Sequence, residues 1–333
     1  MSAPMPVLAP EMRRVLDQLA AAAAGSPGRY DLPFPEARRA LEQERAAWAA
    51  GAPDMWRVTD ATITAAGWPV ALRLYEPAAA AGAVVMLYLH GGGWCVGSLA
   101  THDRIMRSLA AASGLAVLGI DYPLAPEAPF PAALEVTTFL LGQSALPLGD
   151  RRVPVGRWLA AGDSAGANLA LAATMRLRDR GALLPAGLLL YYGCYDRNFQ
   201  TDSYRRFGDG RFGLSVAAMR HYWDAYLRAG TGGDVAGAFP LRGDLRGLPP
   251  CFVLAAACDV LHDDSATLAA ALRKAGVTVS DTTAAGMVHG FLAYGMALPQ
   301  ANAALAAGGR WAAGIGTQCG AASGARAYSA MPK

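Results

Sequence analysis

The chain has 333 residues, of which 53% belong to the hydrophobic set AVILMFWYC and 17% are charged, enough apolar sequence for one large or two ordinary domains. This composition excludes an intrinsically disordered chain and a highly solvated repeat array. The formal net charge is only +3, from 29 Lys and Arg against 26 Asp and Glu, and the arginines are scattered, which argues against nucleic-acid binding.

The five cysteines favour a reducing compartment. They are odd in number, widely spaced and without a C-x-x-C pair, so they indicate neither a disulfide framework nor a zinc site. We expect no metal and no cofactor. Residues 1–14 lack a basic segment followed by an apolar one, so we expect no secretory signal and a cytoplasmic location. Residues 78–101 lack Asp, Glu, Lys and Arg, but their three glycines predict a strand and a loop rather than a membrane span.

Two helices are predicted at the start of the chain. The first ends at Gly25 and has apolar residues at the helical spacing i, i+3, i+4, i+7, namely Met12, Val15, Leu16 and Leu19. The second follows Pro35 and runs to about Ala50, with Leu41 and Trp48 on one face.

The middle of the chain predicts an open α/β architecture. Residues 56–59 and 70–75 form a hairpin pattern, and the strand-like runs that follow are almost continuously apolar, as expected of parallel strands buried on both faces. The predicted parallel strands are 84–89, 115–120, 157–161, 188–192, 252–257 and 277–283. The predicted helices between them are 103–113, 131–142, 165–180 and 263–275.

One long segment interrupts this alternation. Residues 196–233 are aromatic and punctuated by glycine, with a helical stretch at 216–227, and an insertion of this length inside a domain is usually functional, for example a lid. The sequence therefore divides into amino-terminal helices over 1–50, a core over 51–195 and 234–317, an insertion over 196–233, and a flexible tail over 318–333 that is rich in Ala, Gly and Ser. The family resemblance described below implies that residues 1–50 and 196–233 form a cap over a catalytic core.

Gly162-Asp163-Ser164-Ala165-Gly166 is a G-x-S-x-G sequence between a predicted strand and a predicted helix. This is the setting of a nucleophile elbow, a sharp turn whose flanking glycines avoid collisions with the neighbouring strand and helix. On this motif alone, a glycine-rich turn with an inert serine stays an alternative.

His90-Gly91-Gly92-Gly93-Trp94 directly follows a predicted strand. Adjacent glycines leave backbone N–H groups free to approach a ligand, and such donors stabilise a tetrahedral oxyanion. The alternative is a phosphate-binding loop, but neither a G-x-G-x-x-G fingerprint nor a Walker lysine supports it.

A serine hydrolase of this layout presents an acid and then a base later in the chain, each just after a strand. Asp259 and His289 occupy such positions in that order. Asp263 and Asp264 fit better as first-turn residues of the next helix. Cys95 is expected to be a small buried residue and not a nucleophile. The other histidines fit the role of base less well by position: His90, His102, His221 and His262.

Together, HGGGW, GDSAG, Asp259 to Asp263 and His289-Gly290-Phe291 resemble the bacterial hormone-sensitive-lipase family of esterases, an α/β-hydrolase group. The stretches 121–127 and 130–133 resemble that family's loop before the elbow, and the similarity covers about residues 56–298. The chain departs from the family pattern at Pro123, where an Arg is usual, and at Ala167, where a Gly is usual.

The resemblance implies an α/β-hydrolase fold, with a mostly parallel central sheet flanked by helices and a helical cap over the site. It implies a serine carboxylesterase in which Ser164 is the nucleophile, His289 the base and Asp259 its orienting acid. We expect the N–H of Ala165 to bind the oxyanion and, by resemblance, those of Gly92 and Gly93.

The expected substrate is a small-molecule ester of short to medium acyl length. Four residues are expected to line the acyl and alcohol pockets, with packing of the cap against the core as the alternative for each: Trp94, Tyr195, Phe212 and Tyr222. An amidase or deacetylase of a specific small molecule stays an alternative, because the motifs do not define the leaving group. A non-catalytic receptor on the same fold is disfavoured by the complete triad. No stable membrane association is expected, and a homodimer stays open.

Overall fold

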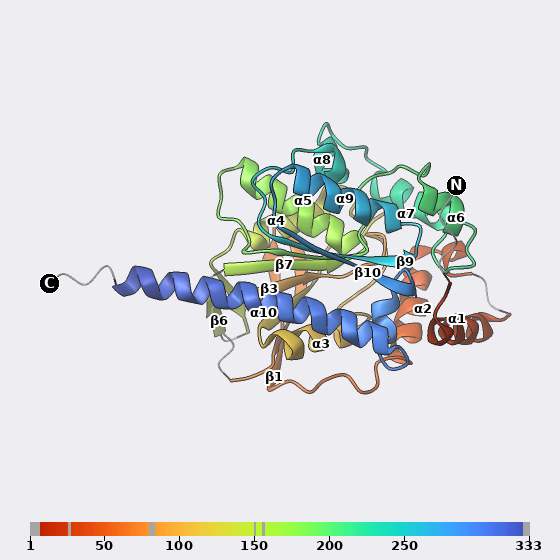
Figure 1. Cartoon of the computed structure of the whole chain (residues 1–333), viewed down its shortest axis with the longest axis horizontal. Coiled ribbons are helices and arrows are strands. Elements are labelled where there is room, and N and C mark those ends of the chain that lie inside the picture. Colours follow the sequence, from red (N-terminus) through yellow and green to blue (C-terminus); the bar gives the residue numbers. More distant parts are fainter. Residues whose placement is uncertain (1–6, 26–27, 80–83, 150, 155–156, 329–333) are drawn as a thin grey trace.

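An eight-stranded sheet runs through the protein, whose computed structural model describes residues 7–25, 28–79, 84–149, 151–154 and 157–328 (Figure 1). Its spatial order is β1-β2-β4-β3-β7-β8-β9-β10. The first two strands form an antiparallel hairpin, β2 pairs antiparallel with β4, and all further neighbours are parallel. The hairpin and the mostly parallel sheet were predicted from the sequence. The bounds are β1 (Arg57–Ala65), β2 (Trp68–Glu76), β3 (Val84–Leu89), β4 (Ala116–Asp121), β7 (Arg157–Asp163), β8 (Leu188–Tyr191), β9 (Cys251–Cys258) and β10 (Val279–Val288).

The register of the central strands determines which loops meet. All residues of β3 and β8 are buried, which is why these segments are continuously apolar. Leu89 of β3 pairs with Gly162 of β7, so the glycine-rich loop emerges beside the G-x-S-x-G turn. Val288 of β10 pairs with Cys258 of β9, so the residues that follow these two strands are also neighbours.

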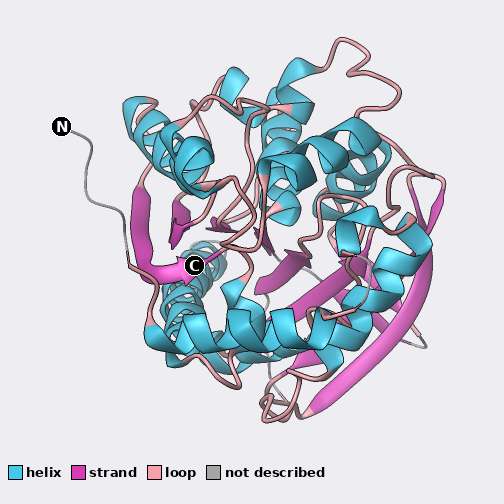
Figure 2. Cartoon of the chain, turned by 90° about the vertical axis from the view of Figure 1, so that its right-hand side faces the viewer, coloured by secondary structure: helices cyan, strands magenta, loops and turns pink. Residues whose placement is uncertain are grey.

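Helices cover both faces of the sheet (Figures 1 and 2). One face carries α4 (Ala132–Leu141), α5 (Ala165–Asp179) and α9 (His262–Lys274), and the other carries α3 (Asp103–Ser113) and α10 (Pro299–Tyr328). α10 lies against α3 so closely that a Cβ at Gly309 would be 2.5 Å from the Cβ of Ala112. Small residues in α10 therefore allow the two helices to approach.

The remaining helices gather at the carboxyl end of the parallel strands, on the right in Figure 1: α1 (Pro10–Ala23), α2 (Phe34–Ala46), α6 (Asp202–Phe207) and α7 (Val216–Tyr226). The amino-terminal segment and the insertion meet there. Phe34 stacks on His221 with ring centroids 4.8 Å apart, and Tyr30 contacts Tyr222 edge to face at 5.8 Å. α7 matches the predicted helix, and a short α8 (Val235–Ala238) follows it.

Two strands run further than predicted, since β1 extends to Ala65 and β10 to Val288, and the fold differs from the prediction in three other places. α2 ends at Ala46 rather than near Ala50, although Trp48 is still buried, against the ring of Tyr294. A separate hairpin, β5 (Ala145–Leu148) and β6 (Arg151–Pro154), was not predicted. α10 continues to Tyr328, whereas an irregular tail was predicted from Gln318; alanine is the strongest helix former and outweighs the glycines here. Residues 329–333 of the predicted tail lie outside the described residues.

Candidate active site

Ser164 lies at the sharp junction between β7 and α5, with φ 54° and ψ −121°. A non-glycine residue in this region is strained and persists only where its surroundings enforce it. The surroundings here are tight, because a Cβ at Gly166 would be 1.9 Å from the carbonyl oxygen of Leu89, and one at Gly162 would be 2.5 Å from the backbone of Gly166. The glycines of the motif are therefore required by close backbone approach.

The structure brings Ser164, His289 and Asp259 together from three separate strand ends. Nε2 of His289 is 2.9 Å from Ser164 Oγ, and its Nδ1 is 2.8 Å from Asp259 Oδ2. With the proton on Nδ1, the imidazole donates to the carboxylate and can accept from the serine hydroxyl. Asp259 is 1% exposed, and its Oδ1 also accepts from the N–H of Leu261 at 3.0 Å, which holds the carboxylate in place. The arrangement can deprotonate a serine.

The glycine-rich loop lies beside the serine and lines the same pocket. Gly92 and Gly93 have φ of +125° and +58°, where L side chains are strained, and a Cβ at Gly93 would be 2.3 Å from the ring of Tyr222. Ala165 is the first residue of α5, where backbone N–H groups have no partner within the helix. Gly92 and Gly93 thus line the pocket together with Ser164, and Ala165 follows the serine directly at the start of α5.

A buried carboxylate that the sequence analysis did not assign joins the two motifs. Asp163 Oδ1 accepts from Tyr88 Oη at 2.8 Å and from the N–H of Gly91 at 2.9 Å, and it is 3.3 Å from His102 Nε2. Burial alone would raise the pKa of Asp163, but His102 and these hydrogen bonds hold it at about 2. A Cβ at Gly91 would be 2.5 Å from Asp163 Oδ2. Asp163 thus anchors the start of the glycine loop; its place as the variable residue of the motif gave no signal of this role.

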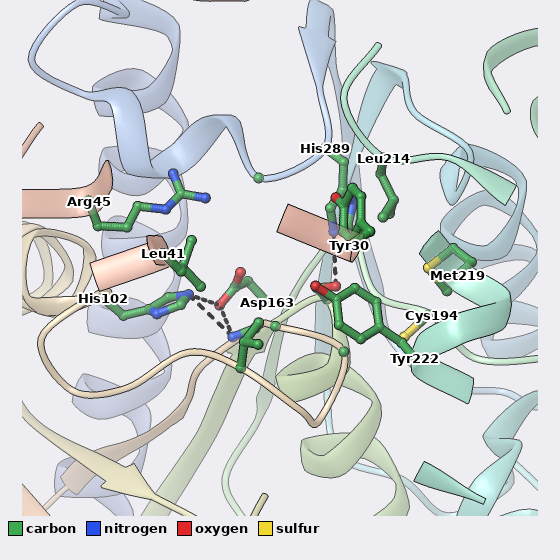
Figure 3. Close-up of a pocket in the computed structure, with 16 residues that line it drawn as sticks. Tyr30, Leu41, Arg45, His102, Asp163, Cys194, Leu214, Met219, Tyr222 and His289 are labelled. Carbon is green, nitrogen blue, oxygen red and sulfur yellow. Dashed lines mark hydrogen bonds and ion pairs between the residues drawn. The ribbon is translucent and has the colours of Figure 1, made fainter. Parts of the chain in front are cut away.

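The serine lies in a small pocket between the core and the two segments predicted to form a cap (Figure 3). The cavity volume is about 90 Å³. From the amino-terminal segment and the insertion, the lining residues are Tyr30, Leu41, Arg45, Leu214, Met219 and Tyr222.

Only Tyr222 of the four residues predicted to line the pocket does so. Trp94 is fully buried behind the glycine loop, stacked on Tyr226 with centroids 4.2 Å apart. Tyr195 is also fully buried, and Phe212 packs edge to face on Phe207. The predictions for Trp94, Tyr195 and Phe212 are wrong, because these three rings pack against other parts of the protein and do not line the pocket.

The competing side chains have other environments. His262 Nδ1 lies 3.1 Å from the carbonyl oxygen of Ala256, and His221 stacks on Phe34 at the start of α2. Burial raises the pKa of the Cys95 thiol far above its usual range, which makes it a poor nucleophile. Asp263 and Asp264 both lie on α9, as predicted, and accept from backbone N–H groups of residues 203, 195 and 196.

The loop that contains Pro123 is held by a cation from α2. Arg38 donates to the carbonyl oxygens of Cys95 and Ala125 at 2.8 and 3.0 Å and forms a bidentate pair with Glu127. One arginine therefore ties α2 to the end of the glycine loop and to the 121–127 loop. Among the described residues, no group of His, Cys, Asp and Glu could hold a metal ion, and no helix there has the length and apolar character to cross a bilayer.

Comparisons with known proteins agree with this geometry. A family model described as the alpha/beta hydrolase fold matches residues 86–293. The chain is 38% identical to an acetyl esterase of Salmonella choleraesuis over 273 residues, which cover 80% of this chain and 83% of that protein. The chain belongs to the α/β-hydrolase family. It is a carboxylic ester hydrolase, and its resemblance to the hormone-sensitive-lipase group is confirmed.

Solved structures of esterases share this α/β-hydrolase fold. An ester hydrolase from the metagenome of Lake Arreo, complexed with a phosphonate derivative, superposes with a TM-score of 0.84 at 32% identity, covering 94% of this chain and all of that one. An esterase of Pyrobaculum calidifontis gives a TM-score of 0.81 at 29% identity, with 93% and 99% coverage. The predicted fold class, a mostly parallel sheet flanked by helices, is therefore confirmed.

Proposed function

We propose that this α/β-hydrolase is a serine carboxylesterase that works through an acyl-enzyme. The observation that carries the proposal is the continuous hydrogen-bonded line from Ser164 Oγ through the His289 imidazole to Asp259, open to a pocket at the serine end. Ser164 Oγ attacks the ester carbonyl while His289 Nε2 takes its proton. His289 then gives that proton to the leaving alcohol, and Asp259 stabilises the imidazolium.

The tetrahedral intermediate needs donors for its oxyanion. The N–H of Ala165, at the positive end of α5, and those of Gly92 and Gly93 supply them in this proposal. Water then enters, His289 acts as base again, and the acyl group leaves as the free acid. Asp163 acts only as a positioning residue, through the N–H of Gly91.

The size of the pocket supports short acyl groups. An engineered cavity of about 150 Å³ binds benzene, whereas this cavity measures about 90 Å³. The relatives named acetyl esterases agree with such a preference. We therefore place the best substrates at the short end of the two-to-eight-carbon range.

Ser164→Ala tests the nucleophile. The variant should stay folded and lose about 10⁴-fold or more in kcat on p-nitrophenyl acetate, and it should no longer gain the mass of an organophosphate reagent. Ser280→Ala, at an exposed position of β10, is the matched control and should behave as wild type. Ordinary turnover by Ser164→Ala, or no labelling of the wild type, would show that Ser164 is not the nucleophile.

A further inference from the structure

Arg45 places a cation in the wall of the pocket that contains Ser164 and His289. It lies in the last turn of α2, its side chain is 15% exposed, and Figure 3 shows its guanidinium directed toward the interior of the pocket. A Cβ at Gly290, the residue after the base, would be 3.7 Å from Arg45 Nη2. The mechanism described above makes no use of this charge.

Contacts within the protein use only some of the hydrogen-bond donors of the Arg45 guanidinium. Arg45 Nε is 3.8 Å from Glu44 Oε1, an oxygen that also accepts from Tyr294 Oη, and the guanidinium carbon lies 4.7 Å from the centroid of the Tyr294 ring. Nη1 is buried and has no hydrogen-bond partner among the described residues. Asp163, the carboxylate among the residues that line this pocket, already has three polar neighbours.

Such an arrangement is costly unless a ligand completes it. Arginine stays protonated in proteins, so Arg45 cannot escape burial by losing its charge. A buried donor without an acceptor destabilises the protein, and a charged donor does so more strongly. A carboxylate is the acceptor that best matches a planar guanidinium, because its two oxygens can take parallel N–H donors.

We propose that Arg45 is a specificity residue for esters that carry a carboxylate, separated from the scissile ester by a short carbon chain. The proposal rests on the serine-esterase function and adds the substrate class. The carboxylate accepts from the Arg45 guanidinium, whose Nη1 has no other partner among the described residues, while the ester carbonyl lies at Ser164. Neutral acetyl and butyryl esters still react, without this contact.

The test compares each acid with its uncharged carboxamide. One series consists of monoethyl esters of dicarboxylic acids from succinate to suberate, and a second of O-acetyl hydroxyalkanoic acids of matching length, each beside its amide. The two series distinguish a carboxylate on the acyl group from one on the alcohol. Product release followed by proton NMR gives kcat/KM without an activated leaving group.

The wild type should prefer the acid over its amide by about ten-fold or more at one chain length of at least one series. Arg45→Met should abolish that ratio, mainly through KM, and Arg45→Lys should keep part of it, because it retains the charge but not the planar fork. Arg39→Met, at an exposed position on the same helix, should leave the ratio unchanged.

Two results overturn the assignment while leaving the esterase intact: no acid preference in either series, or a preference that survives Arg45→Met. Should Arg45→Met not fold, inhibition of wild-type ethyl acetate hydrolysis decides instead. Hexanoate should then compete at least ten-fold better than hexanamide, and equal inhibition refutes the proposal. If the wild type neither hydrolyses ethyl acetate nor reacts with an organophosphate, the serine-esterase function itself fails and Arg45 loses its role with it.

Discussion

Asp259 differs from the two acidic residues that follow it in what its carboxylate touches. It alone reaches His289 Nδ1, whereas Asp263 accepts from the N–H of Ser203. Asp259→Asn should therefore keep the fold and lower kcat by about 10⁴-fold, because an amide favours the wrong imidazole tautomer and cannot stabilise the imidazolium.

Asp263→Asn is the matched control, since an amide oxygen can still accept from Ser203. It should cost about 0.3–1 kcal/mol of stability at the start of α9 and little activity. Circular dichroism establishes that both variants are folded, and kcat is measured on the same ester. Equal losses of kcat in the two variants would show that Asp259 is not the acid of the triad.

His90 makes the stability of the protein sensitive to mild acid. Burial, together with the charge of His102, lowers the pKa of His90 from 6.5 to about 3. Between pH 6.5 and about pH 3, His90 is therefore protonated in the unfolded chain but neutral in the folded protein. His90 does not reduce the free energy of unfolding above pH 6.5. As the pH drops from 6.5 toward 3, it lowers that free energy by up to about 1.4 kcal/mol per pH unit.

Urea unfolding at pH 7 and pH 5 measures the effect. The wild type should lose about 2 kcal/mol more over this interval than His90→Asn, which keeps a donor for the carbonyl oxygen of Gly91. His221→Gln, at an exposed histidine, should follow the wild type. Nitrogen NMR of labelled histidine offers a check without any variant: a His90 ring that is protonated at pH 5.5 would contradict the prediction.

The sequence was sufficient to predict that Ser164, Asp259 and His289 lie together, but not what surrounds them. Ser164, Asp259 and His289 each follow a strand, and the ends of parallel strands share one edge of the sheet. The roles of Asp163 and Arg45 were not predicted from the sequence. Their roles depend on which side chains the tertiary packing places beside them, and no sequence spacing encodes that packing.

At the scale of elements, the side chain of Trp94 packs the glycine loop against α7. Its ring stacks on Tyr226 at 4.2 Å and contacts Trp223 at 4.4 Å. Trp94→Ala should cost about 3–5 kcal/mol and also lower kcat, because the backbone of the neighbouring Gly93 loses its support. Trp56→Ala, which removes a tryptophan that is 49% exposed, should change neither quantity much.

Urea midpoints and kcat on p-nitrophenyl acetate provide the comparison. A Trp94→Ala protein with normal kcat would show that α7 does not position the loop. β3 was predicted with its observed bounds and β7 to within two residues, because buried parallel strands are continuously apolar. α10 was missed because its Ala- and Gly-rich sequence lacks the amphipathic period by which helices are recognised.

At the scale of the whole molecule, the pocket between the core and the segments predicted to form a cap should limit the length of the acyl chain. Each further methylene gains about 0.8 kcal/mol only while the pocket has room. kcat/KM on p-nitrophenyl esters should therefore be highest from acetate to butyrate and decline by octanoate. Met219→Ala, which removes a lining side chain of α7, should shift the optimum to longer chains. Faster hydrolysis of an emulsified long-chain triglyceride than of dissolved butyrate ester would contradict this size limit.

The first helix is anchored on the last strand, since the N–H of Ala9 donates to the carbonyl oxygen of Gly286 at 3.1 Å. A ribosome releases α1 first, but its docking site is complete only after β10 has been made. Until then α1 leaves Met12 and Val15, both buried in the finished protein, without their partners. Contacts of such long sequence separation are slow to form. The nascent chain therefore exposes an apolar helix face until β10 has been made, a surface that chaperones recognise and that favours aggregation when they are scarce.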